Sequence, residues 1–201
     1  MIGLTLASQS SARKKILRDA GIEFQAIASN VDEQAEKTRL LAAGATPADI
    51  AEALARAKAL DIAAHTPGWV IGADQTLEFQ GVTYDKVESL AAARERLAML
   101  SGHMHLLQTA TAVARDGQIV WRNLTTCRLT MRRFSDAYLD SYLDRNMPGI
   151  LSSVGWLNEV FGLCRSIQAA WRTNEAGTAT PILLEIIRVS LPKPISRSRL
   201  Y

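Results

Sequence analysis

The sequence has few cysteines, few aromatic residues and no long apolar run. Its two cysteines, Cys127 and Cys164, lie far apart without a CxxC spacing, so they predict neither a disulfide framework nor a zinc site. Aromatic residues make up 6% of the chain, which argues against a nucleic-acid surface built on stacked bases. No apolar run approaches the ~20 residues of a membrane span, and no basic segment precedes the first apolar stretch, so we expect no signal peptide. These absences favour a reducing, cytoplasmic setting.

A strong excess of one charge is also missing. The formal net charge is +3, and residues 156–201 supply all of it with six basic and three acidic residues, so residues 1–155 are neutral. A general nucleic-acid footprint is therefore not predicted for the body of the chain. Binding of nucleic acid by the basic end stays open as the weakest of three functional interpretations. At 201 residues the chain is long enough for one well-cored domain, or for two small lobes around a cleft.

Periodicity and turn signals predict a mixture of strands and helices, and so an α/β fold with an antiparallel element in its middle. The expected strands cover residues 2–7, 22–29 and 69–73, and residues 76–83 are expected to form a strand and a turn around Gln80-Gly81. The expected helices begin near Ser10 or Ser11, Thr46, Ser89 and Ser135. Asp116-Gly117, between two further expected strands, is the strongest hairpin signal in the chain. Residues 30–37 form an acidic, polar stretch with no assigned element.

The stretch from Ser8 to Lys14 supports two interpretations. A strand followed by a serine-rich turn and a helix start offers backbone N–H groups, hydroxyls and a partial positive charge to an anion. Arg13 and Lys14 would add contacts to a phosphate. The stretch is no Walker loop, because it lacks the GxxxxGK[ST] pattern. The alternative is a capped helix with a basic outer face, and spacing alone favours this plainer interpretation.

Two acids and two lysines complete the candidate residues. Asp74 is expected at the tip of a buried strand, where an aspartate is well placed to bind a hard cation or to orient a water. Glu33 follows the second expected strand, Lys58 lies in an alanine-rich helical stretch, and Lys86 follows an expected hairpin. Plain alternatives stay open here: Asp74 starts a turn, and the other three side chains are solvated.

Taken together, these segments resemble the Maf family of septum-formation-related nucleotide pyrophosphatases. The similar segments, in order over residues 2 to about 150, are LASQSSARKKIL, VDEQ, LARAKA, VIGADQTLEFQG, YDKVES and LSGHMHLLQTATAV. The first segment and VIGAD are the specific ones. The resemblance implies a Maf/inosine-triphosphatase-like fold, in which two lobes flank a nucleotide cleft on an elongated mixed sheet. It assigns residues 1–155 to this domain and leaves 156–201 as an atypical C-terminal segment.

The resemblance also implies a chemistry. The reaction is hydrolysis between the α and β phosphates of a nucleoside triphosphate to a nucleoside monophosphate and pyrophosphate, with Mg²⁺ or Mn²⁺ as cofactor. Phosphate binding would fall to Ser8, Arg13, Lys58 and Lys86. Metal binding would fall to Glu33 and Asp74, and Asp74 would also accept the proton of the attacking water. The expected partner is the nucleotide substrate, with neither nucleic acid nor membrane, and a homodimer is the candidate assembly.

The sequence departs from the family pattern where the base is selected. Ala12 stands in place of a second arginine, and Gln75 follows Asp74 where members that cleave dTTP and UTP have threonine. Glutamine is typical of members that resemble 7-methyl-GTP pyrophosphatases, so we expect that branch or a relaxed specificity. Val87 replaces a proline after Lys86, which predicts a looser loop.

The composition changes abruptly near residue 155. The expected glycine-rich and aromatic strands do not follow, and the chain ends in a polar, basic stretch instead. Our hypothesis is a reading-frame change at this point, which resequencing of the gene would test; Glu159 would then stand in for a base-selecting residue. An alternative function follows from the same change: a nucleotide-binding or cell-division regulatory protein that no longer turns over its ligand.

Overall fold

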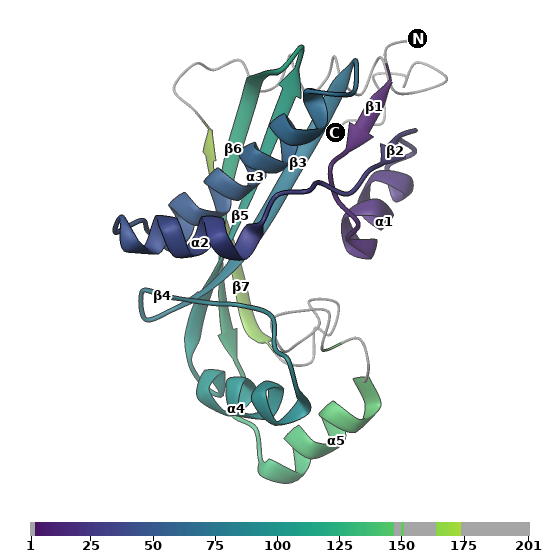
Figure 1. Ribbon diagram of the computed structural model, residues 1–201. Helices are drawn as coiled ribbons and strands as arrows, with labels where there is room; N and C mark the ends of the chain where they lie inside the picture. Colours follow the sequence, from purple (N-terminus) through teal and green to yellow (C-terminus); the bar gives the residue numbers. More distant parts are fainter. Residues whose placement is uncertain (1–2, 147–149, 151–163, 174–201) are drawn as a thin grey trace. The chain divides into compact units, whose positions relative to one another are not determined.

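The computed structural model describes residues 3–146, 150 and 164–173 (Figure 1). Strands and helices are mixed along the chain, which confirms the α/β class. The strands are β1 (Leu4–Leu6), β2 (Gln25–Ala26), β3 (Trp69–Phe79), β4 (Val82–Tyr84), β5 (Met104–Arg115), β6 (Gln118–Met131) and β7 (Cys164–Thr173). The helices are α1 (Ser11–Asp19), α2 (Glu33–Ala42), α3 (Pro47–Ala63), α4 (Leu90–Leu100) and α5 (Asp136–Asn146). No helix in this part of the chain combines the length and apolar composition needed to cross a membrane.

The strands form one mixed, seven-stranded sheet with the order β2-β1-β3-β5-β6-β7, and β4 pairs with β3. β1 is parallel to β2 and β3, whereas β4 is antiparallel to β3. The chain divides into two compact units. Unit 1 comprises Met1–Asp74, Thr109–Leu124 and Arg172–Tyr201, and unit 2 comprises Gln75–Gln108 and Thr125–Trp171. β3, β5 and β6 each pass from one unit to the other, so both units are built on parts of the same strands.

Unit 1 begins with the turn from β1 into α1. β1 pairs with β3 with Leu6 opposite Ile71. Ser10 then caps α1, because its Oγ accepts a hydrogen bond from the Arg13 backbone N–H at 3.4 Å. Gly21, with a φ of +71°, follows the helix and lets the chain turn back towards β2. The predicted start and stop of this helix are confirmed.

A capping box fixes the start of α3. Thr46 Oγ1 accepts a hydrogen bond from the Asp49 N–H at 3.2 Å, and the Asp49 carboxylate accepts one from the Thr46 N–H at 2.9 Å. Pro47 occupies the first helical position, where its missing N–H costs no hydrogen bond. These local signals explain why the helix could be predicted from residue 46 onward.

Small residues make the contact between α3 and the sheet. The buried cluster around this contact is rich in alanines of α3 and β5, namely Ala51, Ala55, Ala59, Ala63, Ala110, Ala112 and Ala114. Gly72 of β3 faces the same helix. A Cβ at this position would lie 2.6 Å from the Ala59 nitrogen and would collide with the carbonyl oxygen of Ala55. The α3 backbone therefore lies directly against β3, which only small side chains permit.

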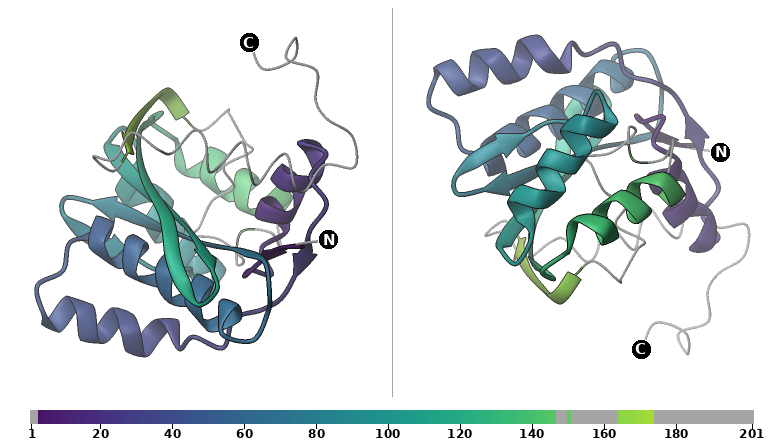
Figure 2. Two further views of the ribbon diagram at one scale, coloured as in Figure 1. Left: turned by 90° about the horizontal axis from the view of Figure 1, so that it is seen from above. Right: turned by 90° about the horizontal axis from the view of Figure 1, so that it is seen from below.

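Unit 2 has a core of larger side chains. Leucine, phenylalanine, tyrosine and methionine side chains from its strands and from α4 and α5 form one buried cluster, in which Tyr142 is 1% exposed. The two helices lie side by side (Figures 1 and 2). Arg94 of α4 joins them by donating hydrogen bonds to the carboxylates of Asp136 and Asp140 at 2.9 and 2.7 Å.

The predicted hairpin between β5 and β6 is confirmed. Its two turn residues, Asp116 and Gly117, have φ angles of +51° and +74°. Two successive positive φ angles are typical of a type I′ turn, whose twist matches that of the flanking strands. Asp-Gly adopts this turn readily, since glycine tolerates the left-handed region without steric cost.

The secondary structure differs from what the sequence predicts in three places. The strands expected over 69–73 and from residue 76 are not separate, because β3 runs unbroken from Trp69 to Phe79 and Asp74 lies within it instead of at a tip. No glycine or proline lies between Ala73 and Phe79 to end the strand earlier. The turn expected around Gln80-Gly81 is confirmed, with φ angles of +54° and +79°. The strand expected over 22–29 is reduced to β2. α2 occupies most of the acidic stretch, where Asp32 caps the helix and acids in the first turn favour it.

Candidate active site

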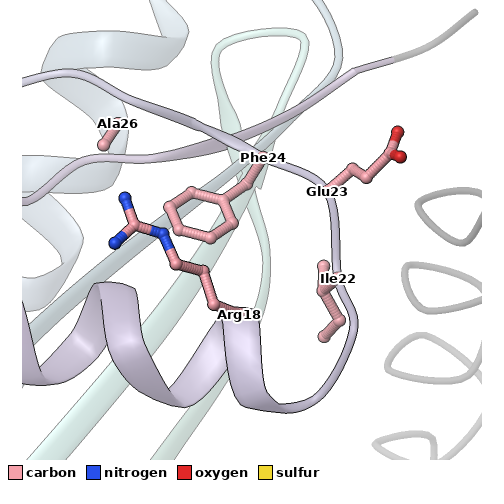
Figure 3. Close-up of a pocket in the computed structure, with 5 residues that line it drawn as sticks. All are labelled: Arg18, Ile22, Glu23, Phe24 and Ala26. Atoms are coloured by element: carbon pink, nitrogen blue, oxygen red, sulfur yellow. The ribbon is translucent and has the colours of Figure 1, made fainter.

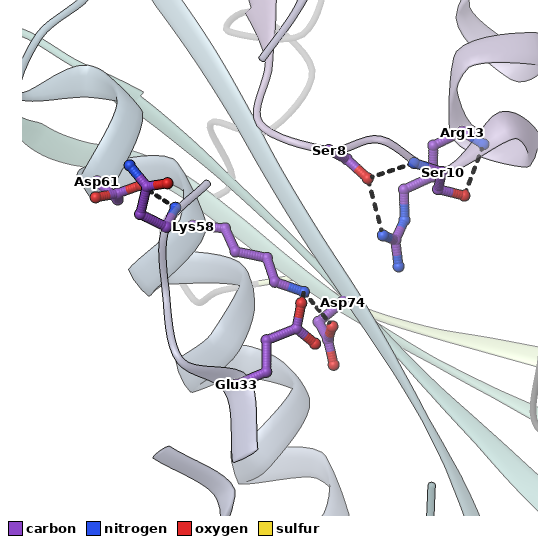
Figure 4. A network of polar contacts seen from close by, with 8 residues as sticks. Ser8, Ser10, Arg13, Glu33, Lys58, Asp61 and Asp74 are labelled. Atoms are coloured by element: carbon purple, nitrogen blue, oxygen red, sulfur yellow. Dashed lines mark hydrogen bonds and ion pairs between the residues drawn. The ribbon is translucent and has the colours of Figure 1, made fainter. Parts of the chain in front are cut away.

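Ser8 and Arg13 meet in the turn that follows β1. Ser8 Oγ accepts hydrogen bonds from the Ser10 backbone N–H and from the Arg13 guanidinium, each at 3.2 Å (Figure 4). Ser8 is buried, and the preceding Ala7 N–H donates to the carbonyl of Ile71 at 2.8 Å, which ties the turn to β3. A guanidinium and a helix N-terminus therefore lie together at the carboxyl end of a parallel strand, a place suited to phosphate.

Lys58 lies between two carboxylates. Its Nζ is 2.8 Å from Glu33 Oε1 and 2.7 Å from Asp74 Oδ1. The side chains of Lys58 and Asp74 are 7% and 9% exposed, while that of Glu33 is 46% exposed. Figure 4 shows the lysine side chain running from α3 to Asp74, with Glu33 beside it. The interpretations of Lys58 as a solvated side chain and of Asp74 as a turn residue are therefore wrong.

Opposing influences act on the Asp74 carboxyl. Burial raises its pKa above the ordinary value, because the ionised form loses its water. The charge of Lys58 and its hydrogen bond lower this pKa, Glu33 raises it, and Arg13 lowers it, with burial the largest influence. A carboxylate with a raised pKa accepts a proton more readily than an exposed aspartate, which suits it to activate a water.

Three elements of unit 1 bring Glu33, Lys58 and Asp74 together. Glu33 is the first residue of α2, Lys58 lies on α3, and Asp74 lies on β3. Gly72 precedes Asp74 by two residues, so both face the same side of the strand. Because Gly72 lets the α3 backbone approach β3, the ammonium of Lys58 reaches the carboxylate of Asp74 on that strand.

The structure leaves the other predicted site residues untested. Gln75 and Lys86 belong to unit 2, and Ala12 is exposed in the first turn of α1. Glu159 lies outside the described residues, as does most of the 156–201 segment. The roles of these residues in base selection and phosphate binding stay predictions.

The loop that carries Lys86 is held by packing. Val87 is 4% exposed and belongs to the core of unit 2. Arg96 of α4 donates a hydrogen bond to the carbonyl of Asp85 at 3.1 Å, and its guanidinium lies 4.6 Å from the centre of the Tyr84 ring. Valine therefore anchors the loop through its burial, so the missing proline does not leave the loop without support. Lys86 itself is exposed.

The two carboxylates suit a divalent cation carried with a polyphosphate. Among the residues that the structure describes, there is no group of three or more His, Cys, Asp and Glu side chains that could hold a metal alone. Glu33 and Asp74 nevertheless converge on one positive charge, the Lys58 ammonium. Mg²⁺ is commonly bound by one or two carboxylates, with waters and substrate phosphates as its other ligands. The donor set therefore fits such a cation.

One polar contact beside these residues is not predicted by the sequence analysis. Asp61 Oδ2 accepts a hydrogen bond from the Asn30 backbone N–H at 2.8 Å, which joins α3 to the loop before α2 (Figure 4). Asp61 follows Lys58 by three residues, and this helical spacing places both on one side of α3. That spacing is the signal that could have found Asp61. Its partner is a backbone group, which no sequence pattern reveals.

A separate hollow lies on the surface of unit 1 (Figure 3). It has a volume of about 310 Å³ and is lined by Arg18, Ile22, Glu23, Phe24 and Ala26, from the end of α1 to β2. None of these residues belongs to the Lys58 group or to the Ser8–Arg13 turn. The side chains expected of a phosphate site are therefore those shown in Figure 4, and this hollow contains none of them.

Comparison with known proteins shows the family of the chain. Residues 3–156 match the family described as Maf-like protein. The chain belongs to the Maf family. A nucleoside triphosphate pyrophosphatase of Caulobacter vibrioides is 51% identical over 152 residues, 76% of each chain. A 7-methyl-GTP pyrophosphatase of Brucella abortus is 41% identical over 155 residues, 77% of this chain and 78% of the relative. A nucleoside triphosphate pyrophosphatase of Rhodospirillum rubrum is 45% identical over 151 residues, 75% of each chain.

The Maf match includes every candidate residue of unit 1 and stops near the change in composition. It ends at residue 156, next to the point where the sequence departs from the family pattern. The division into a Maf domain over 1–155 and an atypical segment over 156–201 stays a prediction, as does the frame change. The recognition of the Maf family from its scattered segments is confirmed.

Replacing Lys58 by methionine should destabilise the protein by roughly 3 kcal/mol at neutral pH, because Asp74 would stay buried without its counter-ion. Without the lysine, the already raised pKa of Asp74 rises further. A folded-state pKa above the unfolded one lowers stability as pH rises, so the loss should shrink as pH falls towards the ordinary aspartate value. Urea unfolding of both proteins from neutral to mildly acidic pH measures this.

The matched control for this variant is Lys15→Met. Lys15 pairs with Asp19 on the surface of α1, with 64% of the lysine side chain exposed. Its removal should change stability by less than about 0.5 kcal/mol at any pH. A loss in Lys58→Met that is as small as in the control, or that stays constant with pH, would contradict the assignment of Lys58 as the counter-ion of Asp74.

Proposed function

We propose that this Maf protein is a nucleoside triphosphate pyrophosphatase. It hydrolyses the bond between the α and β phosphates and releases a nucleoside monophosphate and pyrophosphate. The observation that carries the proposal is the meeting of Lys58 with Glu33 and Asp74, in the same unit as the Ser8–Arg13 turn. Positive groups for a polyphosphate and a buried carboxylate for a water are both present there. The names of the Maf relatives support the same reaction.

The turn after β1 would bind the phosphate chain. Its backbone N–H groups and the start of α1 favour an anion. Arg13 would turn its guanidinium from the Ser8 hydroxyl to a phosphate oxygen, where a charge-assisted hydrogen bond is stronger. Lys58 supplies a second positive charge, and Lys86 is proposed as a third. Holding the substrate in one orientation removes much of the entropic cost of the reaction.

Asp74 would act on the attacking water. Its carboxylate would accept a proton from the water as the oxygen bonds to one of the two phosphorus atoms flanking the α–β bridge. The bond from that phosphorus to the bridging oxygen breaks, and the positive groups stabilise the charge that develops on the phosphates. The raised pKa of Asp74 supports this role, since it reflects a carboxylate ready to take up a proton.

A divalent cation, Mg²⁺ or Mn²⁺, is proposed as the cofactor. Glu33 and Asp74 would hold it, and when bound it would neutralise phosphate charge and orient the phosphate oxygens. For both carboxylates to become available, the Lys58 ammonium has to leave the position that it occupies between them. The incoming phosphates give that ammonium a new anionic partner.

The preferred base is proposed from Gln75 and Ala12. Gln75 matches the pattern of members that resemble 7-methyl-GTP pyrophosphatases, and Ala12 marks the loss of an arginine that helps to select the base, so 7-methyl-GTP or a relaxed range of nucleotides is expected. Glu159 is proposed as a further base-selecting residue. A cytoplasmic setting and a homodimer complete the proposal; Cys127 is a free thiol, in keeping with a reducing compartment.

A panel of nucleotides tests the proposal. We expect pyrophosphate release from at least one of 7-methyl-GTP, GTP, dTTP, UTP and CTP in the presence of Mg²⁺ or Mn²⁺, and its loss when a chelator is added. Two carboxylates alone should bind a cation weakly, so activity should rise with the concentration of free metal. Chromatographic separation of the products identifies the monophosphate and so the bond that is cleaved.

Preference for 7-methyl-GTP would support the argument from Gln75, and preference for dTTP or UTP would contradict it. Folded protein that releases no pyrophosphate from any nucleotide would overturn the enzymatic proposal. If that protein still bound nucleotides in calorimetry, the alternative of a nucleotide-binding or regulatory protein would replace it.

A further inference from the structure

The start of α2 is joined to α3 at two places. The Asn30 N–H donates to Asp61 Oδ2 at 2.8 Å, and Glu33 Oε1 lies 2.8 Å from Lys58 Nζ. The two partners on each segment are three residues apart, and the segments pair in opposite directions, so the contacts follow one another like the rungs of a ladder. Three residues are close to one turn of α3, which explains why both rungs arise from one side of the helix.

One of the two contacts restrains the main chain, and the other restrains a side chain. Asp61 binds a backbone group and therefore fixes the main chain, whereas Lys58 meets a carboxylate that is 46% exposed. Glu33 follows Asn30 by three residues and is the first residue of α2. Between them, Asp32 commits its own carboxylate to capping the helix. The position of the Glu33 backbone therefore depends on where the main chain at Asn30 is held.

α2 gains little from its own packing. None of its residues is buried, so hydrophobic contact does not fix its start firmly. The ion pair joins the buried Lys58 ammonium to a carboxylate that is 46% exposed, and the rotamer freedom of the Glu33 side chain leaves the main chain of α2 only loosely placed by it. The hydrogen bond from Asn30 to Asp61 is exposed, but it holds the main chain directly and is therefore the contact best placed to fix the start of α2.

We propose that Asp61 is a positioning residue for this site. By holding the Asn30 N–H it sets the start of α2 and keeps the Glu33 carboxylate at Lys58 and Asp74. The inference rests on the proposed function, since the importance of Glu33 does. Asp61 is assigned no contact with the substrate, and it acts through the main chain alone.

Two substitutions separate the hydrogen bond from the charge. Asp61→Ala removes the acceptor and should lower kcat/KM for pyrophosphate release about three- to tenfold, the range expected for the loss of one hydrogen bond. Asp61→Asn keeps an acceptor oxygen without the charge and should restore most of the activity. Glu52→Ala removes another carboxylate of α3 away from the two rungs and should leave kcat/KM unchanged.

The decisive comparison repeats Asp61→Ala in a Glu33→Gln background. If Asp61 acts through Glu33, its removal costs little once the Glu33 carboxylate is gone, so the two effects are not additive. A general loss of stability would lower activity equally in both backgrounds. Equal losses, or no loss in Asp61→Ala alone, would overturn the proposal.

Hydrogen exchange gives a measure that needs no catalysis. Asp61→Ala should speed exchange of the Asn30 and Ala35 amides, which mark the loop and the capped first turn of α2, and Asp61→Asn should leave them slow. If the wild-type protein releases no pyrophosphate, the proposed function fails, and the exchange of these amides alone tests the positioning role of Asp61. Unchanged exchange in Asp61→Ala would then overturn the positioning role, and faster exchange would support it.

Discussion

Asp74→Asn is expected to lower kcat/KM for pyrophosphate release by about three orders of magnitude, the range for loss of a general base. Asparagine has the size of aspartate but does not take up a proton at neutral pH. The fold should survive, because asparagine keeps an oxygen that accepts a hydrogen bond from Lys58, and Lys58 keeps Glu33 as a counter-ion at 2.8 Å. Initial rates at saturating Mg²⁺, with circular dichroism and thermal unfolding as checks on folding, measure the effect.

Asp19→Asn is the matched control. It makes the same chemical change on α1, where Asp19 is 61% exposed and pairs with Lys15. Its rate should equal that of the wild type. If folded Asp74→Asn kept activity within about tenfold of the wild type, a role for Asp74 as the base would be excluded, since general-base catalysis contributes more than that.

Gly72→Ala is expected to destabilise the protein by about 3 kcal/mol, at the upper end for overpacking. The added Cβ would meet backbone atoms of α3, lying 2.6 Å from the Ala59 nitrogen, and backbone cannot move aside as a flexible side chain can. For a chain of this size the melting temperature should fall by about 10 °C. Activity should fall as well, because a displaced α3 carries Lys58 away from Asp74.

Gly3→Ala tests whether the effect is specific to this contact. A Cβ on Gly3 would meet nothing within 4 Å. This variant should therefore unfold close to the wild-type temperature. Equal melting temperatures for Gly72→Ala and the wild type would mean that α3 does not rest on the β3 backbone as described.

The parts of the fold that were predictable have local signals. Thr46, Pro47 and Asp49 specify the start of α3 within four residues, and Asp116-Gly117 specifies a hairpin within two. α2 was missed because an acidic stretch of low hydrophobicity gives no periodic pattern. Its start depends on the Asp32 cap, and its place depends on the contact with α3. β3 was divided in two because a buried aspartate inside a strand is unexpected until its partner is known.

The candidate site was predictable only through the resemblance to Maf proteins. Spacing alone favoured a capped basic helix at Ser8–Arg13 and a solvated Lys58. The structure shows Lys58 buried, because Gly72 brings α3 onto β3 and Asp74 supplies a counter-charge. These are contacts between residues far apart in the sequence, and no local pattern encodes them. For Asp61, the spacing from Lys58 indicates the residue but not its partner, which is a backbone N–H.

The alanine-rich contact between α3 and the sheet has a calorimetric consequence. The heat capacity change on unfolding grows by about 0.45 cal/K/mol for each Å² of apolar surface exposed. Alanine exposes much less of that surface than the leucine, phenylalanine and tyrosine side chains in the core of unit 2. Each residue of the alanine cluster therefore adds little to this change. The packing around Lys58 and Asp74 should accordingly vary less steeply in strength with temperature than the leucine-rich core does.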